Sequence, residues 1–466
     1  MDSFHPLLSA LLARSDAAAA LIGSGITSVT MALPDVGFDG LPQGLPQGLT
    51  DFIYWASPED RHFLLGCEQV VSVETTGQRH IGALAAALQS MQTNWRQFDL
   101  DDLGQSPALF TGFPFAAASA NDATEHTTAG LSAFLRLPLI TLQRQRAVCS
   151  LTLNWHRDKG DGEAAKAAWL HALQRLLIAV SSPIDAAPCA NPLRRVSATP
   201  NDATWLARVG QATQDIHQGL LKKVVLSRHI HVVAPRRFEP ARLLINLAQR
   251  FPSCVQIAMT GDFGVLAAAT PERLIRLKHG RLHSDALAGT WRRDPDEGRD
   301  ALLGFDLQHS DKALHEHQLV VDAILRRLAP VSSDLTYPEE PLLMRLRGLH
   351  HLWTPIEGKP AREIGLLDLA ERLHPTPAVG GAPSAAALDW LARHGETRDG
   401  LYTGVFGWMT PGGDGDLSVV LRCAVLKDNH AHLSAGAGIV GSSDPIEELA
   451  ETELKLAAML DALEEA

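Results

Sequence analysis

The chain has 466 residues, of which 45% are hydrophobic and 20% are charged, a composition typical of a globular protein in water. Its formal net charge is −12 and its Lys and Arg residues form no dense run, which argues against a nucleic-acid partner. The five cysteines are scattered and none are spaced as C-x-x-C, so reduced thiols in the cytoplasm are predicted rather than a disulfide or zinc framework.

The first part of the chain carries no motif of its own that indicates chemistry. Its N-terminal apolar stretch follows Asp2 and is interrupted by Arg14 and Asp16, so neither a signal peptide nor a membrane span is expected. Probable strands such as 147–155 alternate with Ala-rich helices such as 162–180. Residues 181–205 hold four prolines among small polar residues, which predicts an irregular connector that divides the chain.

The second part predicts antiparallel strands. Residues 222–233 are β-branched and alternating, 254–261 and 263–270 predict a pair of strands, and 272–290 predict a hairpin that turns at 278–280. Residues 401–440 predict a meander of three strands with turns at 411–416 and 427–430. A helix that starts after Ser310 or Asp311 as N-cap separates these groups.

Near the C-terminus, Gly436, Gly438 and Gly441 match the pattern G-x-G-x-x-G. A dinucleotide site also needs a following helix and a second strand with an acidic residue, but only 25 residues remain and they predict a single helix. We therefore reject a dinucleotide site. Backbone N–H groups beside such glycines can still approach an anion, so another explanation for the pattern is required.

The terminal helix and two strands carry the candidate reactive groups. At helical spacing Glu448, Glu451 and Lys455 share one side, which suits either a solvated face with a Glu451–Lys455 pair or carboxylates that hold a metal. Glu316 is equally open to a surface position or to binding Mg²⁺. Lys223, within a β-branched run, is either an exposed lysine or a buried base. Arg422, also within an apolar strand, lies on a wet face or meets an anion.

Eight stretches in this order resemble the chorismate-utilising enzymes, which include isochorismate, salicylate, anthranilate and aminodeoxychorismate synthases. The matching stretches are KVVLSR (223–228), ATPERL (269–274), ALAGT (286–290), HEHQLVVDAI (315–324), HHLWTPIEG (350–358), LHPTPAVGG (373–381), GLYTGVFGW (400–408) and SAGAGIVGSSDPIEELAETELK (434–455).

The resemblance implies an α/β (α+β) fold, a single large domain over 1–466 with antiparallel sheets packed face to face and helices outside, as in anthranilate synthase component I. Residues 205–460 would form the chorismate-binding catalytic half, and 1–195 the variable N-terminal half.

The same resemblance implies a role for each matching position. Lys223 would be the general base and Glu272 the general acid, with Mg²⁺ held by Glu316 and Glu451 and with Glu448 in or near the metal shell. The remaining implied positions are substrate contacts. They are Gly289, Thr290, His351, Tyr402, Arg422, Gly436, Gly438 and Lys455.

The function that the resemblance favours is that of an isochorismate synthase, which adds water at C2 of chorismate as the C4 hydroxyl leaves and feeds menaquinone or siderophore biosynthesis. A salicylate synthase, which then eliminates pyruvate, is the alternative. Lysine at position 223 is typical of the members that use water, whereas members that use ammonia carry glutamine. No glutamine amidotransferase subunit is therefore expected as a partner. Neither a nucleic acid nor a membrane is expected as a partner either, and the chain is expected to be a monomer or homodimer.

Overall fold

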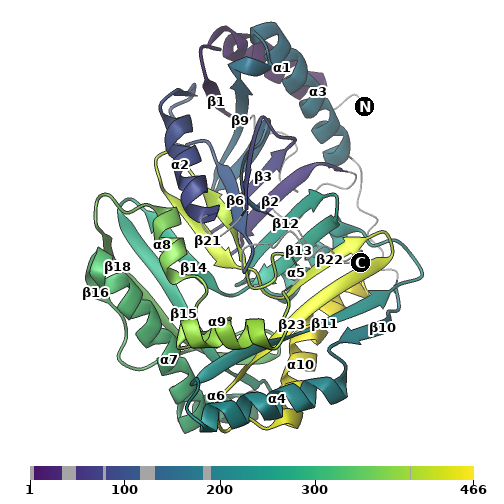
Figure 1. Ribbon diagram of the computed structural model, residues 1–466. Helices are drawn as coiled ribbons and strands as arrows, with labels where there is room; N and C mark the ends of the chain where they lie inside the picture. Colours follow the sequence, from purple (N-terminus) through teal and green to yellow (C-terminus); the bar gives the residue numbers. More distant parts are fainter. Residues whose placement is uncertain (1–4, 34–48, 77–79, 116–131, 182–189, 399) are drawn as a thin grey trace.

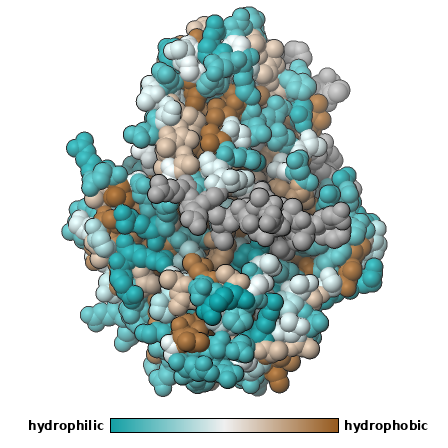
Figure 2. Space-filling view, in the orientation of Figure 1, coloured by the Kyte–Doolittle hydropathy of each residue, from teal (hydrophilic) through white to brown (hydrophobic). Residues whose placement is uncertain are grey.

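The structure, a computed structural model, describes residues 5–33, 49–76, 80–115, 132–181, 190–398 and 400–466. Two large sheets and the helices around them make up these residues (Figure 1). The face shown in Figure 2 is mostly hydrophilic, with hydrophobic residues in small separate groups. None of the helices in the described part of the chain is long and apolar enough to cross a bilayer.

The first sheet has 13 strands, and all of its paired neighbours are antiparallel except β1 and β5. In spatial order the strands are β10 (Arg194–Thr199), β11 (Lys223–Val233), β23 (His430–Ile439), β22 (Cys423–Lys427), β13 (Gly264–Thr270), β12 (Val255–Gly261), β2 (Phe52–Ser57), β3 (His62–Cys67), β8 (Ile140–Gln145), β9 (Val148–His156), β1 (Ile26–Ala32) and β5 (Trp95–Asp99), with β19 (Gly381–Ala382) paired to β11.

The second sheet has ten strands and is antiparallel in every described pair. In spatial order they are β16 (Ser332–Thr336), β18 (Leu349–Pro360), β15 (Arg281–Arg292), β14 (Arg273–Lys278), β21 (Gly415–Val419), β20 (Val405–Met409), β6 (Leu109–Phe113), β7 (Ala133–Leu137) and β4 (Val71–Thr75), with β17 (Leu342–Arg345) paired to β18. Strands from both halves of the sequence therefore contribute to both sheets.

The helices lie outside the sheets (Figure 1). They are α1 (His5–Ala20), α2 (His80–Gln92), α3 (Gly162–Ser181), α4 (Asp202–His217), α5 (Pro240–Arg250), α6 (Glu297–Gln308), α7 (Asp311–Leu328), α8 (Leu366–Leu373), α9 (Ser384–Arg393) and α10 (Pro445–Leu463), together with 3-10 turns at Arg157–Lys159 and Ala329–Val331. Helix α10 packs on β23 of the first sheet, and α7 packs on β15 of the second sheet.

Two of the places where the chain passes from one sheet to the other lie side by side. Pro271 and Glu272 connect β13 to β14, and residues 420–422 connect β21 back to β22. The Val419 N–H donates to the Glu272 carbonyl at 3.0 Å, and the Ala269 N–H donates to the Arg422 carbonyl at 3.2 Å. Two charged residues are thereby fixed at the junction of the sheets.

The structure confirms the predicted fold class of antiparallel sheets packed face to face with helices outside. The strand pair β12–β13, the hairpin β14–β15, the Ser310 N-cap and the single terminal helix are also as predicted. Asp444 caps that helix by accepting from the Ile446 and Glu447 N–H groups.

Two predictions about local structure were wrong. Residues 181–205 are not wholly irregular, because β10 forms within them and α4 begins at Asp202. Strand β10 is the outermost strand of its sheet, where polar residues and a following Pro200 are tolerated. Residues 182–189, which include Cys189, lie outside the described residues.

The predicted three-strand meander over 401–440 is four strands in two sheets. The apolar run 417–426 suggested one strand, but the chain leaves β21 after Val419 and enters β22 at Cys423. Arg422 has φ of 47°, a left-handed conformation that ends extended pairing. Sequence periodicity did not reveal this break because the residues on both sides of it are buried.

Candidate active site

A cavity of about 100 Å³ lies where β11, β23, α7, α10 and the two sheet crossings meet. Twelve of the thirteen residues predicted from the sequence line it. They are Lys223, Glu272, Gly289, Thr290, Glu316, His351, Tyr402, Arg422, Gly436, Gly438, Glu451 and Lys455. Residues that are up to 232 positions apart in the sequence are thus brought to one place, since Lys223 lies on β11 and Lys455 on α10.

Lys223 is a buried lysine rather than an exposed one, since its side chain is only 1% exposed. Its Nζ donates to Glu316 Oε1 at 2.8 Å. Burial acts to raise the pKa of Glu316, but Lys223 and, more weakly, Lys455 hold it below its ordinary value. The pair joins β11 to α7, and the exposed-lysine alternative is excluded.

Glu272 is buried at 4% exposure, in the link between β13 and β14. Burial raises the pKa of its carboxyl to about 8, although the nearby positive charge of Lys223 acts in the opposite direction. Thr376 Oγ1 lies 3.5 Å from Glu272 Oε1. At neutral pH this carboxyl is therefore protonated and can donate a proton.

His351 connects two other polar residues of the cavity. Its Nε2 lies 3.2 Å from an Arg422 guanidinium nitrogen, and its Nδ1 lies 3.0 Å from Thr290 Oγ1. Burial, with Arg422 and Lys455 adding to it, holds the pKa of His351 well below its ordinary value, so the ring is neutral. Because a guanidinium only donates, Nε2 accepts from Arg422 and Nδ1 carries the proton that it donates to Thr290.

The glycines of β23 leave room for neighbouring side chains. A Cβ at Gly438 would lie 2.7 Å from Glu316 Oε1 and 2.8 Å from Lys223 Cε, and one at Gly436 would lie 2.8 Å from the Tyr402 hydroxyl. The third glycine of the pattern, Gly441, would meet nothing closer than 3.4 Å. A Cβ at Gly436 would also lie 2.6 Å from the Leu226 carbonyl oxygen on the neighbouring strand. The close approach of β11 and of cavity side chains therefore explains the first two glycines of the pattern that resembles a nucleotide loop.

Three carboxylates of α7 and α10 lie near one another, two of them in the cavity lining, and each has a lysine partner. Besides Glu316, these are Glu451, which lies 2.7 Å from Lys455, and Glu448, which lies 3.4 Å from Lys312. Burial and the neighbouring Glu451 raise the pKa of Glu448 to about 7. Glu448 is 3% exposed but is not part of the cavity lining.

Both Glu451 and Lys455 belong to the site rather than to a solvated helix face. The Lys455 Nζ also donates to the Gly436 carbonyl at 2.9 Å, which ties α10 to β23. Across the residues that the structure describes, no three His, Cys, Asp or Glu side chains are already arranged to hold a metal ion. The carboxylates in this part of the cavity are hard oxygen donors of the kind that Mg²⁺ prefers.

Sequence reasoning did not single out two further polar residues near these groups, Thr376 and Lys312. Thr376 lies within the matching stretch 373–381, and Lys312 lies one helical turn before Glu316, so spacing on α7 could have indicated it. The apolar part of the lining was also not predicted, because such residues cannot be told from ordinary core residues in a sequence. It includes Val225, Leu287, Ala378, Val379 and Leu421.

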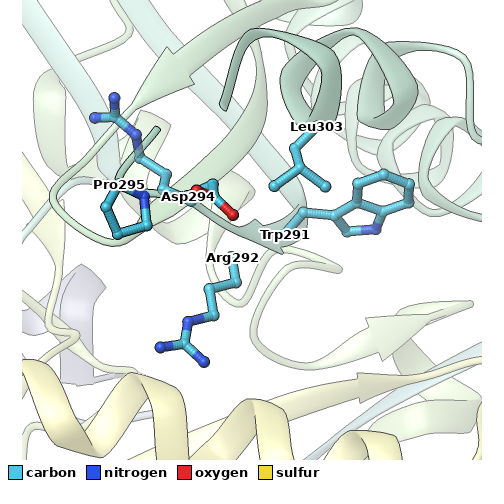
Figure 3. Close-up of a pocket in the computed structure, with 6 residues that line it drawn as sticks. Trp291, Arg292, Asp294, Pro295 and Leu303 are labelled. Atoms are coloured by element: carbon cyan, nitrogen blue, oxygen red, sulfur yellow. The ribbon is translucent and has the colours of Figure 1, made fainter. Parts of the chain in front are cut away.

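A second hollow of about 370 Å³ lies at the end of β15 and contains none of the predicted residues. Its lining consists of Trp291, Arg292, Arg293, Asp294, Pro295 and Leu303. Figure 3 shows Trp291 beside Leu303, with Arg292 pointing away from both. Because it lacks a paired acid and base, we assign the chemistry to the cavity around Lys223 instead.

Comparison with known proteins gives one consistent result. A family described as "Chorismate binding enzyme" matches residues 22–464. The salicylate biosynthesis isochorismate synthase of Pseudomonas aeruginosa is 35% identical over 434 residues, which covers 89% of this chain and 85% of that protein. The isochorismate synthase EntC of Escherichia coli is 39% identical over 265 residues, covering 57% of this chain and 68% of that protein.

Solved structures agree in fold. The menaquinone-specific isochorismate synthase MenF of Escherichia coli superposes with a TM-score of 0.79 over 99% of this chain and all of that chain, at 24% identity. A putative 2,3-dihydroxybenzoate-specific isochorismate synthase from Bacillus anthracis gives a TM-score of 0.70 at 26% identity, over 90% of this chain and 97% of that chain.

Proposed function

The chain belongs to the family of chorismate-binding enzymes, most like the isochorismate synthases, and we propose that it converts chorismate to isochorismate by adding water at C2 as the C4 hydroxyl leaves. The observation that carries this proposal is the pairing of Lys223 with Glu272 in one cavity. Such a reaction needs a base for the water and an acid for the leaving hydroxyl.

In the proposed reaction Lys223 acts in its neutral form, after the proton that it shares with Glu316 has left, and accepts a proton from the attacking water. The new C2–O bond forms while the ring double bonds shift and the C4–O bond breaks. Glu272 supplies the proton with which the C4 hydroxyl leaves as water, so one water enters and one departs. The raised pKa of Glu272 supports this assignment, because the carboxyl holds its proton at neutral pH.

We assign the two substrate carboxylates to different parts of the cavity. Arg422 and the Tyr402 hydroxyl would bind the enolpyruvyl carboxylate, since a buried guanidinium and a phenol are both strong donors. The ring carboxylate would lie near the Gly436 and Gly438 backbone, beside Lys455. His351 would orient Arg422 through the hydrogen bond between them.

The donor set fits Mg²⁺, and we propose that Glu316 and Glu451 hold it, with Glu448 in or near its shell. Mg²⁺ in enzymes is commonly bound by one or two protein carboxylates together with substrate oxygens, so three converging side chains are not required beforehand. The ion would supply positive charge that neutralises the ring carboxylate. The nearness of Glu448 to Glu451 and Glu316 supports the choice of site, because neighbouring carboxylates repel one another unless a cation lies between them.

Water rather than ammonia is the proposed nucleophile, because position 223 holds a lysine. The enzyme is accordingly proposed to work without a glutamine amidotransferase subunit. A cytoplasmic setting stays a prediction from the scattered cysteines. For the pathway we retain both menaquinone and siderophore biosynthesis, because relatives named for menaquinone and for salicylate or 2,3-dihydroxybenzoate all match.

The deciding experiment is a chromatographic product assay with chorismate and Mg²⁺. Isochorismate as the only product supports the proposal. Salicylate and pyruvate in equal amounts would instead identify a salicylate synthase. No consumption of chorismate by the folded protein would refute both.

A further inference from the structure

A buried ion pair lies in the segment that follows α9, behind one wall of the cavity. Glu396 and Arg398 have side chains that are 3% and 5% exposed, and Arg398 donates to Glu396 Oε1 at 3.0 Å. Burying two charges is costly unless their other hydrogen-bonding groups are satisfied, so the partners of each member indicate what the pair holds in place.

Glu396 is anchored to β11. It accepts hydrogen bonds from the Ser227 N–H and, at 2.5 Å, from the Ser227 hydroxyl. A second arginine, Arg208 of α4, donates to its other oxygen at 3.2 Å, from a side chain that is 31% exposed. The carboxylate therefore fixes the segment to the middle of the strand that begins with Lys223.

Arg398 contacts the cavity wall itself. One of its nitrogens donates to the Val225 carbonyl at 2.6 Å and lies 3.5 Å from the Val379 carbonyl. Its guanidinium carbon lies 5.9 Å from the centre of the Tyr402 ring. Val225, Val379 and Tyr402 all line the cavity, whereas Arg398 does not. A single side chain thus joins three separate parts of that wall.

Tyr402 lies close to Arg398 and to His229. Its ring centre is 5.9 Å from the Arg398 guanidinium carbon and 6.0 Å from the centre of the His229 ring, and the planes of the two rings are nearly perpendicular. Its hydroxyl lies so close to β23 that a Cβ at Gly436 would be 2.8 Å away. A small rotation of the ring would therefore move the hydroxyl away from the place where it can meet a substrate carboxylate.

We propose that Arg398 is a positioning residue that sets the Tyr402 ring and the Val225 wall for substrate binding. This inference rests on the proposed function, because it assigns a consequence for the binding of chorismate. Lys223 should keep its place without Arg398, since it pairs with Ala382 of β19, and β11 pairs with β23 from Val224 to Val233. The effect is therefore expected on substrate binding rather than on proton transfer.

The test compares Arg398→Met with Arg208→Met. Both variants remove one guanidinium from Glu396, but only the first removes contacts to the cavity wall. We expect Arg398→Met to raise the KM for chorismate by about tenfold or more with kcat changed less than about twofold, and Arg208→Met to leave both unchanged. Equal effects of the two variants, or a loss confined to kcat, would overturn the inference.

Two further variants keep the result decisive. Arg398→Lys retains the charge beside Glu396 but has no planar fork that can bridge Glu396 and the Val225 carbonyl, so it should also raise KM. It replaces Arg398→Met if that protein does not fold. In a Tyr402→Phe background the effect of Arg398 substitution should shrink, because the hydroxyl that it positions is already absent. Full additivity, or a wild-type KM in Arg398→Lys, would refute the role. Failure of the wild-type protein to consume chorismate would instead refute the proposed function.

Discussion

A methyl group at Gly438 should damage catalysis without unfolding the protein. The added Cβ would lie 2.7 Å from Glu316 Oε1 and 2.8 Å from Lys223 Cε, whereas ordinary contacts begin near 3.4 Å. The pair must therefore shift by roughly 0.7 Å. Because a displacement of about 1 Å in an active site can cost about 100-fold in rate, we expect kcat/KM to fall roughly 10- to 100-fold.

The fold should tolerate this change because Gly438 lies in an extended strand and has no positive φ. Thermal melting should place Gly438→Ala within a few degrees of the wild type, since two flexible side-chain ends absorb the clash. The assay is the initial rate of isochorismate formation over a range of chorismate concentrations, together with melting curves of each variant.

Gly441→Ala is the matched control, because it changes a glycine of the same sequence pattern. Its nearest contact would be His217 Cε1 at 3.4 Å, which is an ordinary distance. We expect its kcat/KM to stay within about twofold of the wild type. Wild-type activity in Gly438→Ala, or an equal loss in Gly441→Ala, would show that the glycines do not serve the Lys223–Glu316 pair.

Three other results are expected. The kcat/KM of the wild type should fall as pH rises through about 8, where Glu272 loses its proton. Glu272→Gln should remove this alkaline fall and lower kcat about 100-fold. A wild-type kcat/KM that is flat across this pH range contradicts the acid role. Lys223→Ala should lower kcat by about 100-fold while calorimetry still detects chorismate binding, whereas a rise in KM alone would make Lys223 a binding residue. The wild-type enzyme supplied with ammonium salts should form no amino product. EDTA should abolish turnover, and Glu451→Gln should raise the Mg²⁺ concentration needed to restore it; full activity in metal-free buffer would exclude the metal.

The fold was predictable where an alternating strand pattern ends at residues that favour a tight turn. The hairpin β14–β15 turns at His279 and Gly280, and both have positive φ, which the Lys-His-Gly sequence suits. The break before β22 was not predictable from pattern, because Val420, Leu421 and Cys423 are as apolar as the strand residues beside them. The pairing of β22 with β13 and β23 decides to which sheet these residues belong.

The candidate site was predictable where a charged residue interrupts an apolar pattern. Lys223 and Arg422 were noticed for this reason, although their burial and partners were not decided by spacing. Glu396 and Arg398 escaped notice because the polar sequence around them suggests an exposed loop. Their burial depends on contacts with β11 and Tyr402, which are distant in the sequence and form only in the folded chain.

The charges of the cavity explain why a dianion would be bound there. Lys223 is already paired with Glu316 and Lys455 with Glu451. Within the described residues Arg422 has no carboxylate within ion-pair distance, and its side chain contacts His351, Cys254 and the Phe251 ring. A partly buried guanidinium of this kind gains most from an incoming carboxylate, because the attraction is screened less than in open water. Arg422 is therefore the position from which recognition of the substrate should start, while the lysines keep their carboxylate partners until a second negative charge and a cation enter.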